Sequence, residues 1–362
     1  MFAKIDIKEK TMKKRFDLFV IILSVGCLLA LSACSDDDGS AGGDEREYKG
    51  IPLVILDTDM GSSTDDLFAL QLLHRYEQEG CCRLLGVVVD REGEDCAACA
   101  DVLNTYFGDG NTPLALVRNG IKNPVVWIDY KQMPYYTLDN GSPMFRRSVS
   151  DYAALPDGYQ LYRRLLAAQP DHSVSICSTG FVTCLAQLLQ SEADEYSELN
   201  GVELVRRKVK CLYLQGGVFG DAEEPDFNLA QGPSFALEFF RLWPKDVDIV
   251  FSPMEVGQAV EYTPSQVISD VSWTDNHPIK QVYMTCDCNT GQRMWDLMTV
   301  IQAVEGDEQF RLSERGTVTL TPECVTHFTP SAFGNCRYQL PGTAEWAAEV
   351  LQKIRDVNME HN

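Results

Sequence analysis

The sequence predicts an α/β protein with a single doubly wound, mainly parallel sheet and helices on both faces. Short apolar runs alternate with amphipathic segments along most of the chain after residue 50. The strand-like runs are continuously apolar, which is typical of strands buried on both faces. The 362 residues are 45% hydrophobic and 23% charged, so the chain can bury a large core.

The first fifty residues are predicted to be a targeting segment followed by a linker. Three basic residues at 13–15 precede an apolar run at 18–31, and small residues lead to Cys34. This order is typical of a lipoprotein signal peptide over residues 1–33, with Cys34 acylated. An ordinary signal peptide with an incidental cysteine is the alternative. Residues 34–50 are rich in Gly, Ser, Asp and Glu and are predicted to be a flexible acidic tether.

These features predict a bacterial cell-envelope protein that meets the membrane only through its lipid anchor. Acidic residues directly after Cys34 resemble the surface-export signals of bacterial lipoproteins, so we expect the periplasmic face or the outer surface. The formal net charge is −22, which repels nucleic-acid phosphates and attracts cations. Nucleic acid is therefore not an expected partner.

The predicted elements follow one another as strand and helix. The first strand is the apolar run 51–56, and an amphipathic pattern at 64–76 predicts the helix after it. Further strands are expected at residues 84–89, 113–117, 173–177, 209–214 and 247–251. Further helices are expected at residues 95–107, 158–168, 182–190, 234–242 and 292–304. No repeat or second linker interrupts the series, which favours one domain over 51–362. Ligands of such folds bind beyond the carboxyl ends of the strands.

Residues 119–155 interrupt this alternation. They carry Trp127, Tyr130, Tyr135 and Tyr136 among prolines and polar residues. Long irregular segments often act as lids or binding loops. A packed surface excursion is the other interpretation.

The mature chain has eleven cysteines at irregular spacing after Cys27 and Cys34 are set aside. Cys96 and Cys99 match a redox or half-zinc spacing, but no second pair completes a site. Helix packing is the alternative, and the sequence assigns no disulfide.

Four carboxylates crowd the end of the first strand and the start of the first helix. They are Asp57, Asp59, Asp65 and Asp66, and Thr64 is a natural N-cap before the last two. Capping and the helix dipole account for one aspartate but not for all four. A cluster of this kind repels itself unless a hard cation with oxygen ligands neutralises it. The segment therefore predicts a metal site.

The same segment resembles the N-terminal signature of the inosine-uridine-preferring nucleoside hydrolases, a strand followed by DTDxGxDDxxAL. Residues 57–61 match its first half and residues 65–70 its second half. Two extra residues stand between Gly61 and Asp65, so the loop must bulge relative to the family.

Three later segments match the family in the same order. Residues 176–183 resemble the strand with TGPLTN, although Cys184 stands where the family usually has asparagine. Residues 215–218 and 225–228 resemble the GGA…EFN segment, with aspartate in place of glutamate. Residues 294–297 resemble the family's His-Asp pair, with tryptophan in place of histidine. Together they cover nearly the whole mature domain.

The resemblance implies a nucleoside hydrolase-like fold and a calcium-dependent activity. Ca²⁺ would be bound by Asp59, Asp66, Asp296 and the carbonyl of Thr179, with ribose hydroxyls and a water completing the shell. The enzyme would cleave the N-glycosidic bond of a ribonucleoside to free base and ribose with the calcium-bound water. Asp59 would be the base. The family also implies purine or pyrimidine salvage and homo-oligomers.

Substrate contacts are implied for five residues. Asp65 and Asn228 would hold ribose hydroxyls, and Asp226 would assist at the sugar. Trp295 cannot protonate a leaving base as the family's histidine does, but it could stack on one or pack in the core. Glu92 follows the second strand, where the family has a ribose-binding asparagine.

Two other functions compete with this interpretation. A haloacid-dehalogenase-type phosphatase would use Asp57 as nucleophile and Asp59 as acid/base with magnesium, and it would release inorganic phosphate. A non-catalytic nucleoside- or sugar-binding lipoprotein on the same fold would bind without turnover. The loop insertion, Cys184 and Trp295 are the departures from the family that keep this second alternative open.

Overall fold

Six parallel strands form the centre of the sheet. The computed structural model describes residues 50–220, 222–286, 288 and 292–360. The strands lie in the order β6-β5-β4-β1-β2-β3 and all neighbours in this series run parallel. They are β1 (Leu53–Thr58), β2 (Arg83–Arg91), β3 (Leu114–Ile121), β4 (Val174–Ser178), β5 (Val209–Gln215) and β6 (Asp248–Ser252). The prediction of a mainly parallel sheet with these six strands is confirmed.

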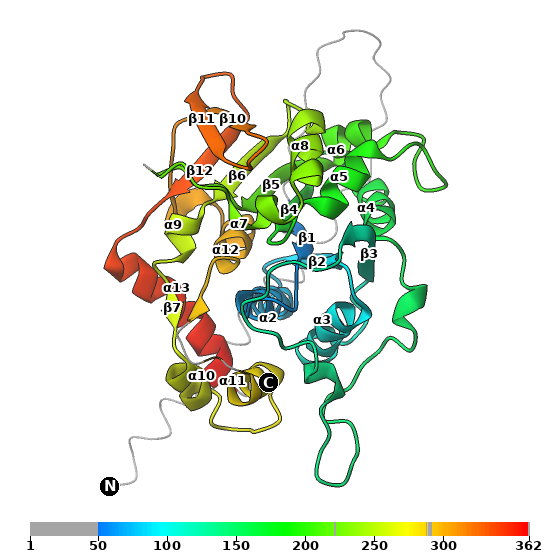
Figure 1. Ribbon diagram of the computed structural model, residues 1–362, viewed down its shortest axis with the longest axis vertical. Helices are drawn as coiled ribbons and strands as arrows, with labels where there is room; N and C mark the ends of the chain where they lie inside the picture. Colours follow the sequence, from blue (N-terminus) through cyan, green and yellow to red (C-terminus); the bar gives the residue numbers. More distant parts are fainter. Residues whose placement is uncertain (1–49, 221, 287, 289–291, 361–362) are drawn as a thin grey trace, which may run out of the picture. The chain divides into compact units, whose positions relative to one another are not determined.

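Helices cover both faces of this sheet, as predicted (Figure 1). Side chains alternate along β1, so that Val54 and Leu56 join one hydrophobic cluster while Leu53 and Ile55 join the other. The first cluster includes α2 (Asp65–Gln78), α3 (Glu94–Tyr106), α12 (Leu297–Glu305) and α13 (Ala344–Met359). The second includes α4 (Gly158–Ala167), α5 (Thr183–Gln190), α6 (Gly201–Lys208) and α8 (Pro233–Leu242). Both faces of the strands are therefore dry, which explains their apolar sequences.

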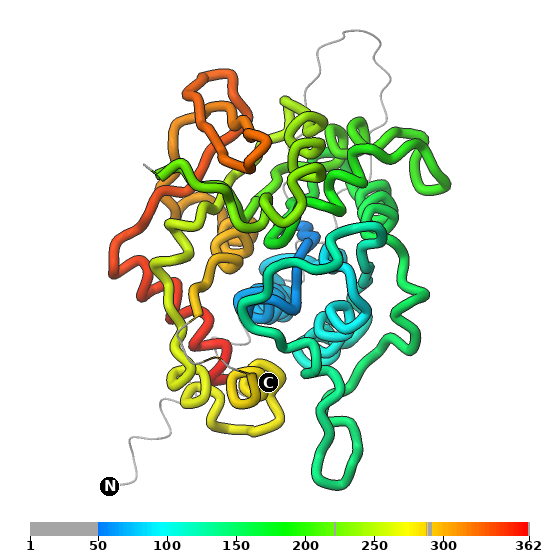
Figure 2. The backbone as a smooth tube through the Cα atoms, in the orientation of Figure 1, coloured from blue at the N-terminus to red at the C-terminus, as the bar shows by residue number. Residues whose placement is uncertain are grey.

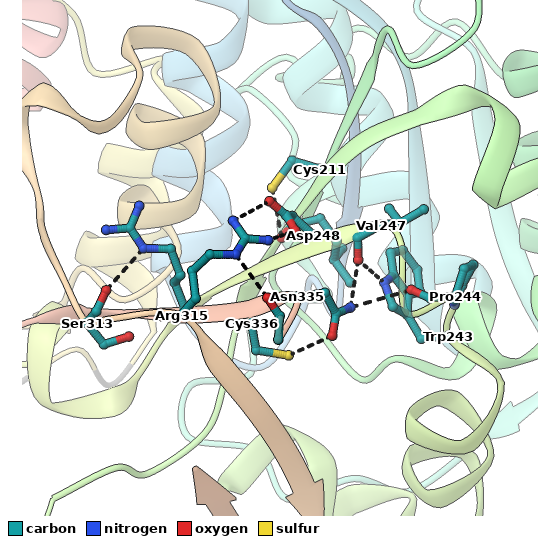
Figure 3. A network of polar contacts seen from close by, with 12 residues as sticks. Cys211, Trp243, Pro244, Val247, Asp248, Ser313, Arg315, Asn335 and Cys336 are labelled. Atoms are coloured by element: carbon teal, nitrogen blue, oxygen red, sulfur yellow. Dashed lines mark hydrogen bonds and ion pairs between the residues drawn. The ribbon is translucent and has the colours of Figure 1, made fainter. Parts of the chain in front are cut away.

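An antiparallel extension beyond β6 was not predicted. It consists of β9 (Arg311–Leu312), β10 (Gly316–Leu320), β11 (Thr326–Pro330) and β12 (Cys336–Leu340). β12 pairs parallel with β6, and Figure 3 shows the polar contacts that join this edge. Arg315 binds the Asp248 carboxylate, and the Asn335 amide donates to the carbonyl oxygen of Val247 at 2.8 Å.

The remaining helices, strands and turns of the described residues are short. They are the helices α7 (Phe227–Gln231), α9 (Met254–Gly257), α10 (Pro264–Asp270) and α11 (Pro278–Thr285), the strands β7 (Glu261–Tyr262) and β8 (Gln292–Arg293), and the 3-10 turns η1 (Met133–Tyr135), η2 (Tyr152–Ala154) and η3 (Asp307–Gln309). None of the helices in the described ranges has the length and apolar character that a membrane span requires. The described residues from 50 onward form one compact unit by their internal contacts.

One predicted helix starts later than expected, and the predicted N-terminal segment lies outside the described residues. The helix expected over 292–304 begins at Leu297, because residues 292–293 pair with β7 instead. The signal peptide over 1–33, the tether that follows it and the lipidated Cys34 lie outside the described residues. The Cys96 and Cys99 side chains form no disulfide within the described residues, and both pack in the core.

The irregular segment 119–155 is a packed excursion that runs along α3 before it returns to α4 (Figure 2). Tyr130, Met133 and Phe145 are buried in it, whereas the Trp127 side chain is 70% exposed. Buried anchors of this kind fix an irregular segment against the helix that it crosses. Trp127 is then held at one position on the surface.

Candidate metal and substrate site

A pocket of about 230 Å³ lies beyond the carboxyl ends of β1, β4 and β5, where the fold class predicts a ligand site. It is lined by Asp59, Ser62, Ser63, Asp65, Asp66, Trp127, Thr179, Gln215, Asp226, Phe227, Asn228, Met254, Gln258, Trp295 and Asp296. Eight of the nine residues that the sequence proposed for metal or substrate are among them. Glu92 is the exception.

Three carboxylates form the tightest acidic group of this pocket. One oxygen each of Asp65, Asp66 and Asp296 lies within 4.8 Å of the others. Asp65 and Asp66 open α2, whereas Asp296 immediately precedes α12, so the group joins the two ends of the domain. The Asp296 backbone N–H donates to Oδ2 of Asp65 at 3.4 Å. The convergence that the sequence analysis expected for Asp66 and Asp296 is therefore present.

Burial makes these charges costly. It raises the pKa of Asp66 and of Asp296 well above the ordinary value, and the neighbouring carboxylates raise both further. Burial is also the main cause that raises the pKa of Asp59 to about 7. Arg91 lies close enough to lower the pKa of Asp59 and Asp66, but it does not reverse the shift. The group therefore needs protons or a cation to neutralise it.

The donor atoms fit a hard cation. Oδ1 of Asp66 accepts from the Thr58 hydroxyl, whereas its Oδ2 is buried with no hydrogen-bond partner in the part of the chain that the structure describes. Thr179 lines the same pocket, and its N–H and hydroxyl both donate to the carbonyl oxygen of Asp57, at 2.8 and 3.0 Å. Carboxylate and carbonyl oxygens are the ligands that Ca²⁺ and Mg²⁺ prefer. A divalent ion of this class suits the site.

Asp59 lies in the pocket but outside the tight triad. Its Oδ2 accepts a hydrogen bond of 3.0 Å from the Ser62 hydroxyl. The Ser63 hydroxyl donates to Oδ1 of Asp65. Two serine hydroxyls of this lengthened loop thus bind the carboxylates on either side of it. Asp65, which the resemblance assigned to ribose, completes the triad.

The β5–α7 region supplies two more of the expected residues. Asp226 caps α7, since its two carboxylate oxygens accept the backbone N–H groups of Leu229 and Gly217, both at 2.9 Å. Burial raises the pKa of Asp226 to about 6. The Asn228 amide donates to the carbonyl oxygen of Thr179 at 3.0 Å and to Oε1 of Gln215 at 2.6 Å. These two donations leave its Oδ1 to accept from a ligand in the pocket.

Trp295 and Glu92 differ in their placement. Trp295 lines the pocket, and its indole N–H donates to the carbonyl oxygen of Met254 at 3.1 Å. Glu92 does not line it. Its N–H donates to the carbonyl oxygen of Ile121 in β3, and its carboxylate pairs with Lys122 at 3.7 Å. The chain after β2 thus follows the edge strand β3 away from the pocket, which is why Glu92 does not reach it.

Asp57 is fully buried and does not line the pocket. Its Oδ2 accepts from the Tyr162 hydroxyl at 2.8 Å, and burial raises its pKa to about 6. The phosphatase alternative needs Asp57 as an accessible nucleophile, so this placement argues against it. Thr64 stands at the N-cap as predicted, but its hydroxyl pairs with the Tyr283 hydroxyl at 2.9 Å and does not cap α2.

Sequence reasoning gave no role to five further residues of the pocket, namely Ser62, Ser63, Gln215, Met254 and Gln258. The first three lie within or between segments that match the family motifs, and the last two lie outside them. A single Ser, Gln or Met residue carries no signal of a site. Trp127 and Phe227 stood in quoted segments without an assigned role. Their rings lie 5.7 Å apart between centroids at the pocket mouth. Their proximity depends on the path of the excursion 119–155, and the sequence alone did not predict that path.

No family model and no curated protein sequence matches the chain. Solved structures match it along almost their whole length. One is an inosine-uridine-preferring nucleoside hydrolase from Bacillus anthracis, with 16% identity, a TM-score of 0.61, and coverage of 85% of this chain and 100% of that one. A purine-preferring ribonucleoside hydrolase from Gardnerella vaginalis has 13% identity, a TM-score of 0.60, and coverage of 85% and 99%.

The type III effector protein XopQ, solved in complex with adenosine diphosphate ribose, has the same fold. Its identity is 14% and its TM-score 0.60, over 87% of this chain and 96% of that one. At such identities the likeness establishes the fold, which is that of the nucleoside hydrolases. Hydrolases and an effector share this fold, so the fold alone does not determine an activity, and the residues of the pocket are the evidence for one.

Proposed function

We propose that this protein is a calcium-dependent hydrolase that cleaves the N-glycosidic bond of ribonucleosides. The observation that carries the proposal is the buried triad of Asp65, Asp66 and Asp296, which lies in a ligand-sized pocket with Asp59 and Asn228. A calcium ion bound there would fix a sugar diol and lower the pKa of a water molecule. Asp66 and Asp296 of the triad would hold it together with Asp59 and the carbonyl of Thr179, and Asp65, the third member, would face the sugar.

Asp59 is the residue that we assign as general base. Its carboxylate lines the pocket beside the triad, so it would lie within reach of a water molecule held by the cation. It would accept a proton from the water that attacks the sugar carbon. Reaction of this bond proceeds through a sugar with oxocarbenium character, and the surrounding carboxylates favour that positive charge.

The remaining pocket residues would orient the substrate. The free Oδ1 of Asn228 and the carboxylate of Asp65 would accept ribose hydroxyls, while Asp226 holds the start of α7 in place. Trp295 and Trp127 offer apolar surface on which a base can stack, which is worth about 1–3 kcal/mol per base. We also propose that lipidated Cys34 anchors the domain to the cell envelope, and that the chain forms homo-oligomers like other members of the family that it resembles.

Ribose release tests the proposal. The purified mature domain is incubated with a panel of purine and pyrimidine nucleosides, with calcium or with EDTA, and free ribose is quantified. We expect calcium-dependent release of ribose and free base, and its loss in Asp59→Ala. Release of inorganic phosphate from phosphorylated substrates in place of ribose would overturn the proposal.

A non-catalytic binding protein is the second candidate. The residues that line the pocket include no histidine, so the described site holds no imidazole to protonate a departing base. Isothermal titration calorimetry separates the two candidates. Nucleoside binding without ribose release in the presence of calcium would support the binding protein.

A further inference from the structure

The lengthened acidic loop between Gly61 and Asp65 is bound to the excursion 119–155. The backbone N–H groups of Trp127 and Ile128 both donate to the carbonyl oxygen of Ser62 at 3.0 Å. One residue earlier, the Gly61 N–H donates to the Tyr130 hydroxyl at 2.8 Å. Tyr130 is fully buried, so these three hydrogen bonds fix the inserted loop to a rigid anchor.

Gly61 also limits how this loop can move. Its φ is +114°, a conformation that favours glycine, and a Cβ there would lie within 3.2–3.3 Å of Cys96, Lys131 and Arg91. The loop is therefore closely packed on one side and hydrogen-bonded on the other. Ser62, which is 1% exposed, has little freedom of its own.

The fixed serine acts on the carboxylate that faces the pocket. Its hydroxyl donates to Oδ2 of Asp59 at 3.0 Å and lies 3.5 Å from the Asp59 carbonyl oxygen. The terminal torsion of an aspartate is soft, so a carboxylate outside a tight cluster can rotate. A hydrogen bond to a charged group is stronger than one between neutral groups, and it restricts that rotation.

We propose that Ser62 is a positioning residue that orients the Asp59 carboxylate, and that the Trp127–Tyr130 segment in turn holds Ser62. The inference rests on the proposed function, because it gives Asp59 a role toward calcium and the attacking water. It assigns a purpose to the lengthened loop, which departs from the family motif. The loop supplies the hydroxyl donor that holds Asp59 beside the triad.

The test compares Ser62→Ala with two matched controls. Ser142→Ala removes an exposed hydroxyl on the same excursion, and Tyr136→Phe removes one that pairs with Thr285. Tyr130→Phe removes the acceptor of the Gly61 N–H. Each protein is stripped of metal, its melting temperature is measured, and calcium affinity is determined by isothermal titration calorimetry. Steady-state ribose release then gives kcat and KM.

We expect Ser62→Ala to lower calcium affinity and kcat by about tenfold each, the size of one charged hydrogen bond, with KM changed less than about threefold. Tyr130→Phe should lower calcium affinity by about threefold, and both controls should match the wild type. A purely structural role for Ser62 would lower the melting temperature of the metal-free protein and leave calcium affinity unchanged.

The possible results distinguish a failure of the Ser62 positioning role from a failure of the proposed hydrolase function. If the wild type releases ribose and Ser62→Ala equals it in calcium affinity and kcat, the positioning role is refuted and the proposed function stands. If the wild type binds calcium but releases no ribose, the proposed function fails and calcium affinity alone decides the role of Ser62. A wild type that binds no calcium overturns both.

Discussion

Replacing Asp66 by asparagine tests the metal site most directly. Asparagine has nearly the same shape, so the fold of α2 should survive. The substitution removes one charge from the triad with Asp65 and Asp296, and it replaces an oxygen by an amide nitrogen that cannot bind a cation. The Thr58 hydroxyl can still donate to the remaining oxygen, as it does to Oδ1 now.

The magnitude follows from the geometry. The triad oxygens lie within 4.8 Å of one another, so two ionised carboxylates repel each other by about 3 kcal/mol at an effective dielectric constant of about 20. Asp66→Asn removes two such repulsions in the metal-free protein at high pH. The metal-free variant should therefore be at least as stable as the metal-free wild type.

Bound calcium should make the wild type more stable than Asp66→Asn. A ligand at a concentration 100 times its dissociation constant raises the free energy of unfolding by about 2.7 kcal/mol. For a domain of this size that corresponds to a rise in melting temperature of roughly 5 °C. The wild type should show this rise and Asp66→Asn should show less than about 1 °C. Ribose release should fall by at least about a hundredfold.

Differential scanning fluorimetry with EDTA and with a calcium series measures both effects. Asp109→Asn is the matched control, because it removes a carboxylate from a surface loop away from the pocket. If Asp66→Asn keeps the calcium-induced rise of the wild type, the assignment of the triad as a cation site is refuted. A metal-free variant that melts well below the wild type would contradict the repulsion argument.

Three further predictions concern pH, substrate charge and stability. Burial raises the pKa of Asp59 from its ordinary value of 3.8 to about 7 in the folded protein, so stability that is present at low pH is lost as the pH rises through 7. In EDTA the melting temperature should fall by several degrees between pH 5 and 8, and calcium should remove most of that fall. The pocket lining has five aspartates and no Lys, Arg or His, so nucleoside 5′-monophosphates should be hydrolysed with a kcat/KM at least about a hundredfold below that of nucleosides, measured by ribose-phosphate release. Arg163 is buried, and it binds the Asp194 carboxylate and the carbonyl oxygens of Ser197 and Leu199. Arg163→Leu leaves these acceptors without their donor, so it should lower the free energy of unfolding in urea by about 1–3 kcal/mol while the KM stays unchanged.

The sequence predicted the parallel core because those strands are buried on both faces, which leaves an unambiguous apolar run such as Leu-Val-Ile-Leu in β1. It did not predict β10, whose residues alternate between buried and exposed. Short half-exposed strands have a weak signal, and their pairing with β12 depends on contacts such as Arg315 with Asp248 that link distant parts of the chain.

Some residues of the site were also predictable from the sequence, whereas others were not. The clustered aspartates of the first loop predicted a cation because their number exceeds what capping needs, but Asp296 was placed there only through the family resemblance. Glu92 was assigned by its position after β2, and the chain turns it toward Lys122 on the side of β3. Ser62 and Gln215 bind neighbouring side chains, and a contact of that kind has no pattern in the sequence.

The charge of the pocket connects the metal with the substrate class. Asp59, Asp65, Asp66 and Asp296 would carry four negative charges when ionised, and one divalent cation compensates two of them. The remaining field acts weakly on a neutral nucleoside but strongly on a sugar that gains positive charge as its glycosidic bond breaks. Interactions that are stronger in the transition state than in the ground state are the ones that accelerate a reaction. The same residual charge repels phosphorylated sugars, so the carboxylates that would bind calcium would also favour neutral glycosides and their cationic transition state.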